Sequence, residues 1–332
     1  MSIAVNKNVA IGVILLVGAF DVPPACADGI YWSDGTRIRR AELDGSNVQD
    51  LVVGLVNLSS MALNVAAGEM YWVDRGANKI QRANLDGTDV QDLVTGLSTP
   101  EGLTVDLVGE RLYWTVIGDS GVSDGKIQRA NLDGSGMEDV VTGLWAPTGL
   151  AVDPDEGLLF WLHSIPSAAG YDKIQRANLD GSNVQDLLAP ENDLWQAGNG
   201  LDVYPGVGRL YWTSHILDSG CIDRANYDGS EDYAYRCATF AGFPAIALDP
   251  NAGHIYYAFG GIWRDGAEFW TDPILLVPDT EVIAIAVHAP SDSIPTVSGW
   301  GMLAMVLLLT AGGTLIFRGH GRARPGEASG EM

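Results

Sequence analysis

Three stretches of the chain repeat nearly the same sequence. They read KIQRANLDGTDVQDLV at residues 79–94, KIQRANLDGSGMEDVV at 126–141 and KIQRANLDGSNVQDLL at 173–188. A pair of aromatic residues recurs with them, at 31–32, 71–72, 113–114, 160–161, 211–212 and 256–257, with spacings of 40, 42, 47, 51 and 45 residues. A period of roughly 40–50 residues, built from short strands and turn signals, is typical of a β-propeller.

Each repeated unit is expected to form four antiparallel strands. In one unit, GLTVD at 102–106 is short and apolar, which suits an inner strand, and RLYWT at 111–115 follows as the second strand. The segments before and after the Asp-Gly turn then form a hairpin, because glycine allows the left-handed backbone of a tight loop. One sheet cannot bury both of its faces alone, so the units are expected to stack as the blades of a ring. The turns begin at Asp44, Asp86, Asp133, Asp180 and Asp228.

The order of the strands predicts how the ring closes. The segment GIYWS at 29–33 is a second strand with no inner strand before it, and VIAIAV at 282–287 is an inner strand with nothing after it. Together they complete one blade. The sequence therefore predicts an all-β fold, a six-bladed β-propeller of four-stranded blades over residues 28–290, closed by pairing of the last inner strand with the first blade.

This pattern resembles the YWTD propeller, the class B repeat of the low-density lipoprotein receptor family. The resemblance covers about residues 29–288 and depends on the aromatic pairs, the Ile-x-Arg-x-x-Leu-Asp-Gly units and strands such as GLAVD at 149–153. It implies a six-bladed ring that binds proteins on one face. At the fourth position of the motif, contacts between blades are expected to vary, because that position is filled by Asp34, Asp74, Val116, His163, Ser214 and Phe259.

The arginine of each unit shares a strand face with the isoleucine two residues before it. These arginines either form a ring that binds anions or donate hydrogen bonds to carboxylates or carbonyls between the blades. The second interpretation is favoured, because a buried guanidinium in every blade needs a partner in every blade. The arginines are Arg40, Arg82, Arg129, Arg176, Arg224 and Arg264.

Two cysteines lie on the two strands of one predicted hairpin. Cys221 and Cys237 are equally far from Gly229, so in an antiparallel hairpin with a three-residue loop they lie directly opposite each other. An exported chain can oxidise such a pair. We predict a cross-strand disulfide, and two buried free thiols are the alternative.

Propeller geometry divides the connections between strands into two opposite faces. The Asp-Gly turns lie on one of them, here called the turn face. The second-to-third and fourth-to-first connections lie on the other, the loop face. Three neighbouring units carry long loops on the loop face, at 115–126, 162–173 and 213–221.

The loop face is the predicted ligand-binding face, because irregular loops on a rigid scaffold often carry recognition. Aromatic residues gather there in the sequence, and such residues commonly anchor interfaces. The alternative for the tryptophans is that they fill gaps between blades. The candidate ligand-binding residues are Trp145, His163, Tyr171, Trp195 and His215.

A metal-dependent enzyme is less well supported. Six-bladed lactonase-type propellers hold a divalent metal in the central tunnel. At the equivalent position of the inner strands, Glu101 and Asn199 offer oxygen ligands, whereas Pro244 and Ile283 offer none. Two ligands make a poor site, so we predict no cofactor and keep Glu101 and Asn199 as the alternative metal site.

Other chemistry has little support in the sequence. No Gly-x-Ser-x-Gly or His-x-x-x-His motif occurs. Aspartates at 119, 124, 153 and 155 are compatible with weak calcium binding, although solvated turns explain them better. The chain has 42 acidic and 19 basic residues, which argues against nucleic acid as a partner, since phosphate binding needs clustered Lys and Arg.

The N-terminal segment 1–27 is predicted to be a signal peptide. It contains Lys7, an apolar run from Val9 to Phe20 and the small residues Ala25 and Ala27 at a cleavage site. A lipoprotein modified at Cys26 is the alternative. Either interpretation predicts an exported protein.

The C-terminal segment predicts a membrane anchor. Residues 300–317 form 18 residues without a charge, followed by Arg318, Arg322 and Arg324 in a basic cytoplasmic tail at 318–332. A buried core helix is the alternative. IPTVSGWG at 294–301, the apolar segment and the arginines resemble the bacterial IPTL-CTERM sorting signal, which makes 291–299 a linker with a sorting motif. The resemblance implies the envelope or surface of a Gram-negative bacterium, and export and sorting machinery as partners.

Together these observations predict an exported, membrane-tethered, non-catalytic binding module that recognises an extracytoplasmic protein or glycan on the loop face. A lactonase-type metal-dependent hydrolase that uses the central tunnel is one alternative. A purely structural protein of the cell envelope is the other.

Overall fold

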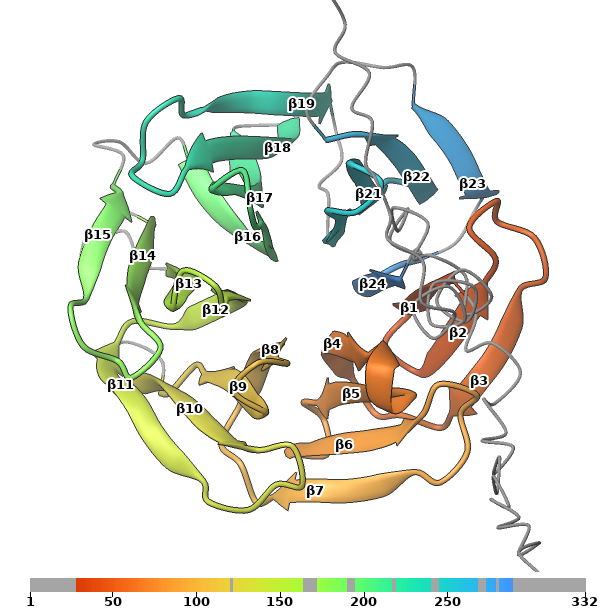
Figure 1. Cartoon of the computed structure of the whole chain (residues 1–332), viewed down its shortest axis with the longest axis horizontal. Coiled ribbons are helices and arrows are strands. Elements are labelled where there is room, and N and C mark those ends of the chain that lie inside the picture. The colour runs from red at the N-terminus through yellow and green to blue at the C-terminus, as the bar shows by residue number, and fades with distance from the viewer. Residues whose placement is uncertain are drawn as a thin grey trace, which may run out of the picture. The chain divides into compact units, whose positions relative to one another are not determined.

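The computed structural model describes residues 28–119, 122–163, 172–189, 195–216, 219–239, 245–267, 273–278 and 281–288. Within these residues the chain forms six sheets of four antiparallel strands, arranged around a central axis (Figure 1). The predicted six-bladed propeller is therefore confirmed. The predicted signal peptide at 1–27, the linker and sorting motif at 291–299, the apolar segment at 300–317 and the tail at 318–332 lie outside the described residues.

The blades are numbered here in chain order. Blade 1 contains β1 (Gly29–Ser33), β2 (Arg37–Ala41), β3 (Gln49–Val53) and β24 (Ala284–His288). Blade 2 contains β4 (Leu58–Asn64), β5 (Glu69–Asp74), β6 (Lys79–Asn84) and β7 (Gln91–Thr95). Blade 3 contains β8 (Pro100–Asp106), β9 (Arg111–Val116), β10 (Gly125–Asn131) and β11 (Glu138–Leu144). Blade 4 contains β12 (Pro147–Asp153), β13 (Leu158–His163), β14 (Lys173–Asn178) and β15 (Gln185–Leu188). Blade 5 contains β16 (Trp195–Tyr204), β17 (Arg209–Ile216), β18 (Ser219–Asn226) and β19 (Tyr233–Thr239). Blade 6 contains β20 (Ile246–Asp249), β21 (His254–Ala258), β22 (Gly261–Gly266) and β23 (Ile274–Pro278). A single turn of 3-10 helix, η1 (Val65–Ala67), follows β4.

No helix among the described ranges has the length and apolar character needed to cross a membrane.

The apolar core lies between the blades rather than inside any one of them. Every residue of β12 is buried, as expected for an inner strand that is covered on both faces. In the outer strand β7, by contrast, only Val94 is buried. Between blades 1 and 2, Tyr31 of β1 and Trp72 of β5 belong to one apolar cluster, so the aromatic pairs of neighbouring units share a core.

The ring closes as the sequence predicts. The last inner strand, β24, pairs antiparallel with β1, and Ile285 lies opposite Trp32 (Figure 1). The strand runs from Ala284 to His288, two residues later at its start than the 282–287 segment expected from the sequence. The seam therefore consists of main-chain hydrogen bonds between the two ends of the propeller sequence.

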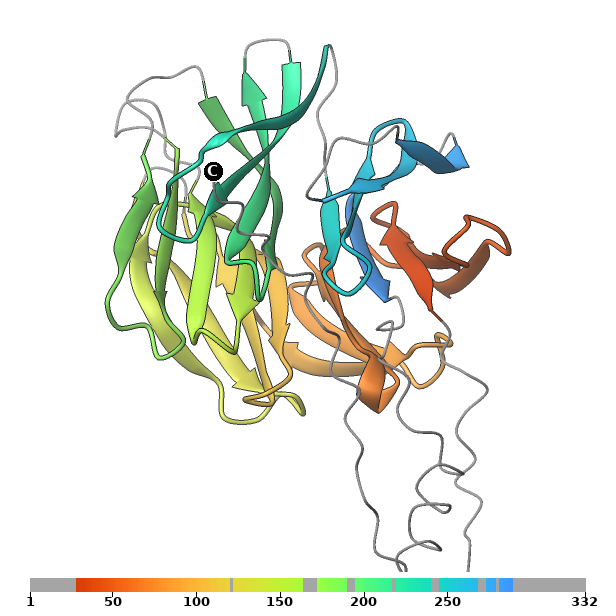
Figure 2. The ribbon, with the colours of Figure 1, turned by 45° about the horizontal axis from the view of Figure 1, so that its top comes forward.

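The Asp-Gly turns pack each blade against the one before it. Gly134 has φ of 82°, and a Cβ at this position would lie 2.5 Å from the main-chain oxygen of Leu93 on β7. Asp133 accepts a hydrogen bond from the Ser135 N–H at 2.9 Å, which fixes the shape of the turn. The tilted view shows the hairpin turns of blades 3 and 4 together on the lower side of the ring (Figure 2). The same backbone contact is made by Gly45 with Leu276, Gly87 with Leu51, Gly181 with Val140, and Gly229 with Leu187.

Candidate functional site

The repeated arginines of blades 3, 4 and 5 donate hydrogen bonds to the next blade. The Nη1 atom of Arg129 donates to the Leu179 carbonyl of the next blade at 3.0 Å. Arg224 does the same to Ala267 at 3.2 Å. These contacts confirm the inter-blade interpretation for blades 3 and 5, and Arg176, which donates to Tyr227, adds blade 4.

In blades 2 and 4 the residue at the fourth position of the aromatic motif contacts the connection from the preceding blade. In blade 2, the carboxylate of Asp74 accepts hydrogen bonds from the N–H groups of Val56 and Asn57, both at 3.2 Å. Residues 56 and 57 belong to the connection between β3 and β4. Asp74 therefore holds a loop of the neighbouring blade on the loop face.

His163 occupies the same motif position in blade 4 and is 2% exposed. Its Nδ1 atom lies 2.9 Å from the carbonyl oxygen of Trp145, and the indole N–H of Trp161 donates to its Nε2 atom at 2.7 Å. A carbonyl only accepts, so Nδ1 carries a proton and donates it to Trp145, whereas Nε2 lies against both the Trp161 N–H and the Oε1 atom of Gln175. This burial corrects the prediction that the His163 side chain forms part of an exposed patch.

The protonation state of His163 follows from its surroundings. Burial lowers its pKa to about 4, although the nearby Gln175 side chain and the Trp145 carbonyl favour the protonated ring. Gln175 in turn donates to Asp186, and Lys173 forms an ion pair with the same carboxylate at 2.8 Å. The charged groups close to His163 are therefore already paired with each other.

Trp145 lies in the connection between β11 and β12, two residues before the first residue of the inner strand. The equivalent residues of the two preceding units are Val56 and Ser98. Trp145 is partly buried and joins none of the apolar clusters formed by the described residues, whereas its neighbour Leu144 is 5% exposed and belongs to one of them. Because serine and an exposed valine fill the same place, packing of the ring does not require a tryptophan here.

The structure brings together fewer of the predicted patch residues than expected. His215 is partly buried on β17, opposite Gly220 of β18. Trp195 begins β16, but its side chain lies outside the described part of the chain, and so does Tyr171. The predicted patch is therefore described at Trp145 and His215, and stays a prediction at Trp195 and Tyr171.

The central tunnel contains a cavity of about 270 Å³, lined by the inner strands. Near the loop face, Glu101 is 5% exposed, and its carboxylate pairs with Arg75 at 2.9 Å. Asn199 donates to the other oxygen of Glu101 at 3.3 Å. Burial raises the pKa of Glu101, although the guanidinium of Arg75 opposes this. The carboxylate is thus already engaged by a cation.

A second carboxylate lines the same tunnel. Asp202 accepts hydrogen bonds from the N–H groups of Val203 and of Leu248 on the next blade, both at 2.8 Å. Burial raises the pKa of Asp202 to about 6, although these two N–H groups oppose the shift.

The tunnel does not fit the divalent metal site weighed from the sequence. A hard cation prefers six or so oxygen ligands, whereas Glu101 and Asn199 bind each other and Arg75 brings a competing positive charge. No cluster of three or more His, Cys, Asp or Glu residues suited to a metal is found in the described ranges. Of the aspartates compatible with calcium, Asp153 accepts from Asp155 N–H and from the Tyr227 hydroxyl, which makes it a turn cap.

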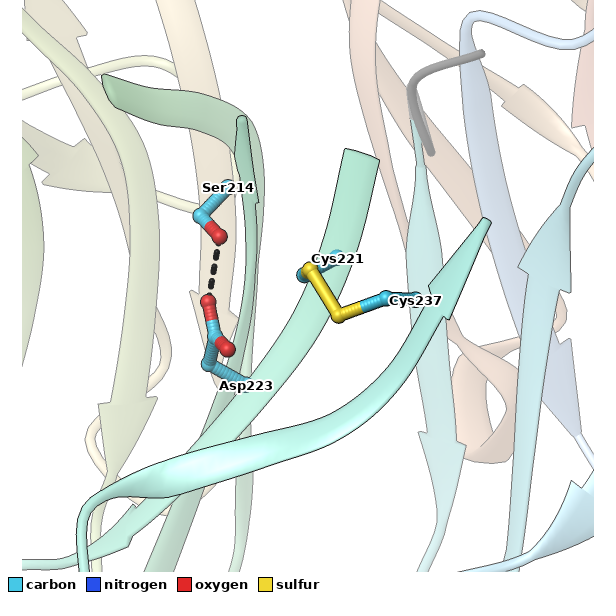
Figure 3. The surroundings of a disulfide bond; sticks show 4 residues. All are labelled: Ser214, Cys221, Asp223 and Cys237. Carbon is cyan, nitrogen blue, oxygen red and sulfur yellow. Dashed lines mark hydrogen bonds between the residues drawn. A yellow bond between two sulfur atoms is a disulfide. The ribbon is translucent and has the colours of Figure 1, made fainter. Parts of the chain in front are cut away.

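The predicted disulfide is present in blade 5. Cys221 of β18 lies directly opposite Cys237 of β19, and the two sulfur atoms are bonded (Figure 3). Cys221 occupies the position of the lysine in the repeat. In blades 2, 3 and 4 that lysine forms an ion pair with an aspartate of the outer strand, at 2.9, 3.0 and 2.8 Å respectively. The disulfide therefore replaces an ion pair as the connection between the third and fourth strands.

Sequence reasoning missed Arg75 and the chemical role of Asp202. Arg75 stands in an ordinary second-to-third connection, and nothing in the local sequence indicates its partner in the following blade. Asp202 lies where the neighbouring units have Thr104 and Ala151, so its charge interrupts an apolar or neutral pattern. That interruption was the available signal.

Comparisons with known proteins agree with this architecture. A family model described as low-density lipoprotein receptor repeat class B matches residues 68–107, which span β5 to β8. The fold is similar to a chain in a crystal structure of a nidogen/laminin complex, with a TM-score of 0.66 and 19% identity over 79% of this chain and 99% of the other.

Other solved propellers are similar as well. A gluconolactonase from Xanthomonas campestris has a TM-score of 0.51 and 20% identity, over 67% of this chain and 77% of the other. TolB from Acinetobacter baumannii has a TM-score of 0.61 and 12% identity, over 80% of this chain and 67% of the other. At these identities the likeness describes the fold alone. The chain thus carries a class B repeat within a six-bladed propeller.

Proposed function

We propose that the chain is a non-catalytic binding module that recognises a protein or glycan on its loop face. The observation that carries this proposal is Trp145, a partly exposed tryptophan at a position where packing does not require one. Tryptophan is enriched among the residues that anchor interfaces. The similarity to a propeller of a nidogen/laminin complex supports a protein as the ligand.

The cell envelope is the proposed location. The Cys221–Cys237 disulfide supports an oxidising compartment, because cytosolic chains rarely keep one. The leader-like segment 1–27, the apolar segment 300–317 and the IPTL-CTERM-like motif support export, sorting and anchoring in a membrane.

The lactonase-type alternative is disfavoured by the ion pair between Arg75 and Glu101, which occupies the acidic ligand a tunnel metal would need. If the alternative were correct, the protein would bind one equivalent of calcium or zinc, and Glu101→Gln would abolish that binding. Isothermal titration with each metal decides between the two. A purely structural envelope protein would bind neither metal nor a saturable ligand.

Affinity capture with the full chain from envelope extracts tests the binding proposal. Trp145→Ala is compared with Val184→Ala, a control on the opposite side of the ring whose side chain is 43% exposed. We expect Trp145→Ala to weaken capture of a specific partner at least tenfold, since anchor residues contribute about 2 kcal/mol or more, and Val184→Ala to leave it unchanged. Loss of capture in Val184→Ala with retention in Trp145→Ala would assign recognition to the turn face.

A further inference from the structure

The same motif position holds the preceding loop with opposite polarity in two blades. Asp74 accepts hydrogen bonds from the N–H groups of residues 56 and 57, whereas His163 contacts the carbonyl of Trp145. Residues 56 and 145 are equivalent in the repeat. Where the motif residue is an aspartate, the loop therefore points N–H groups toward it. Where the motif residue is a histidine, the loop points a carbonyl oxygen toward it.

We propose that His163 is a positioning residue, which fixes the Trp145 loop by donating its Nδ1–H to the Trp145 carbonyl and so presents the indole on the loop face. This inference rests on the proposed function, because it concerns the residue assigned to recognition there. It explains why blade 4 has a histidine where the motif has an aspartate: the loop that carries Trp145 needs a hydrogen-bond donor.

Imidazole supplies the donor that the loop needs. The Trp145 carbonyl only accepts, so Nδ1–H donates to it, while Nε2 of the same rigid ring lies against the Trp161 indole N–H and the Oε1 atom of Gln175. An aspartate would place two acceptor oxygens toward the carbonyl and would repel it. Asparagine can replace only the Nδ1 side of the imidazole, and glutamine can replace only its Nε2 side.

The His163 contact is what distinguishes this loop from the preceding one. Ala146 has φ of 32° before Pro147, but the equivalent Thr99 has φ of 47° before a proline with Val116 at the motif position, so the left-handed residue does not depend on a histidine. Of these two blades, the contact between His163 and the Trp145 carbonyl is specific to blade 4.

Two substitutions separate the donor role from space filling. His163→Asn keeps a donor near the Nδ1 position, whereas His163→Gln keeps a polar group near the Nε2 position and loses the donor to Trp145. Each variant removes one of the two buried hydrogen bonds, so similar losses of thermal stability are expected. Any difference at Trp145 then reports the Nδ1 contact.

The measurement is 19F NMR of the full chain labelled with 5-fluorotryptophan. The chain contains ten tryptophans. The Trp145 line is assigned with Trp145→Phe, and its shift between H₂O and D₂O reports solvent exposure. We expect His163→Asn to leave that line unchanged and His163→Gln to move or split it. Amide exchange across 143–146 should quicken roughly tenfold in His163→Gln only, as for the loss of one hydrogen bond.

Two results would overturn the inference. One is an unchanged Trp145 line and unchanged exchange in His163→Gln. The other is an equal perturbation in both variants, which would make His163 a filler of the space between blades 3 and 4. Because no partner is used, failure here leaves the proposed binding face standing, and failure of affinity capture leaves the role of His163 intact.

Discussion

The two faces of the ring are built on different rules. On the turn face, five glycines meet a main-chain oxygen of the preceding blade, and the sequence around them hardly varies. On the loop face, Asp74 and His163 occupy equivalent positions and make hydrogen bonds of opposite polarity. The difference teaches that backbone-to-backbone contacts keep the repeat uniform, whereas side-chain contacts to loops let individual blades diverge.

The largest loss of stability is expected when the backbone contact between blades on the turn face is disrupted. Gly134→Ala places a Cβ 2.5 Å from the Leu93 oxygen at φ of 82°, so we expect the free energy of unfolding to fall by about 3–5 kcal/mol from strain and overpacking. Gly143→Ala is the matched control, since Gly143 also has positive φ but has no atom near the added Cβ. It should cost about 1–2 kcal/mol. Equal losses in denaturant melts would refute the role of the inter-blade contact.

The next effect compares blade 5 with its uniform neighbours. A double Cys221→Ser and Cys237→Ser variant removes a cross-link that closes a loop of 16 residues, and should cost about 3 kcal/mol. Lys126→Ala removes the equivalent ion pair with Asp139 in blade 3 and should cost about 1 kcal/mol or less, because exposed ion pairs contribute little. Denaturant melts of the two variants measure both. Similar costs would show that the disulfide adds nothing beyond the ion pair it replaces.

The loop face should also respond to pH through His163. Its pKa is about 4 in the folded chain and 6.5 as an ordinary value, so the unfolded chain binds the proton first and stability falls as pH drops from 6.5 to 4. Relative to His163→Asn, we expect the wild-type protein to lose about 2 kcal/mol over this range. Both proteins carry Asp202, whose raised pKa acts in the opposite direction, so its contribution cancels. A constant difference between pH 4 and 6.5 would contradict the buried neutral ring.

The smallest effect concerns Trp145. Trp145→Ala should change the free energy of unfolding by about 1 kcal/mol or less, since the side chain joins no apolar cluster. Leu144→Ala, one residue earlier and 5% exposed, should cost about 2–5 kcal/mol. If the two melts shift equally, Trp145 fills the space between blades instead of serving recognition.

The blades, the closure of the ring and the disulfide were predictable from sequence, whereas side-chain contacts between neighbouring blades were not. The period of the aromatic pairs predicted the blades, the missing first strand predicted that the last inner strand pairs with the first blade, and the spacing around Gly229 predicted the disulfide. These features follow from local turn and strand rules. The Arg75–Glu101 pair and the His163–Trp145 contact depend on how neighbouring blades meet, and no local pattern encodes that.

The closing strand has a consequence for the order of assembly. Residues 284–288 are the last part of the propeller to be synthesised, and blade 1 has no innermost strand until they arrive. A chain still being synthesised therefore has an open sheet edge next to Tyr31 and Trp32. Completion of the ring must wait until nearly the whole domain has been made.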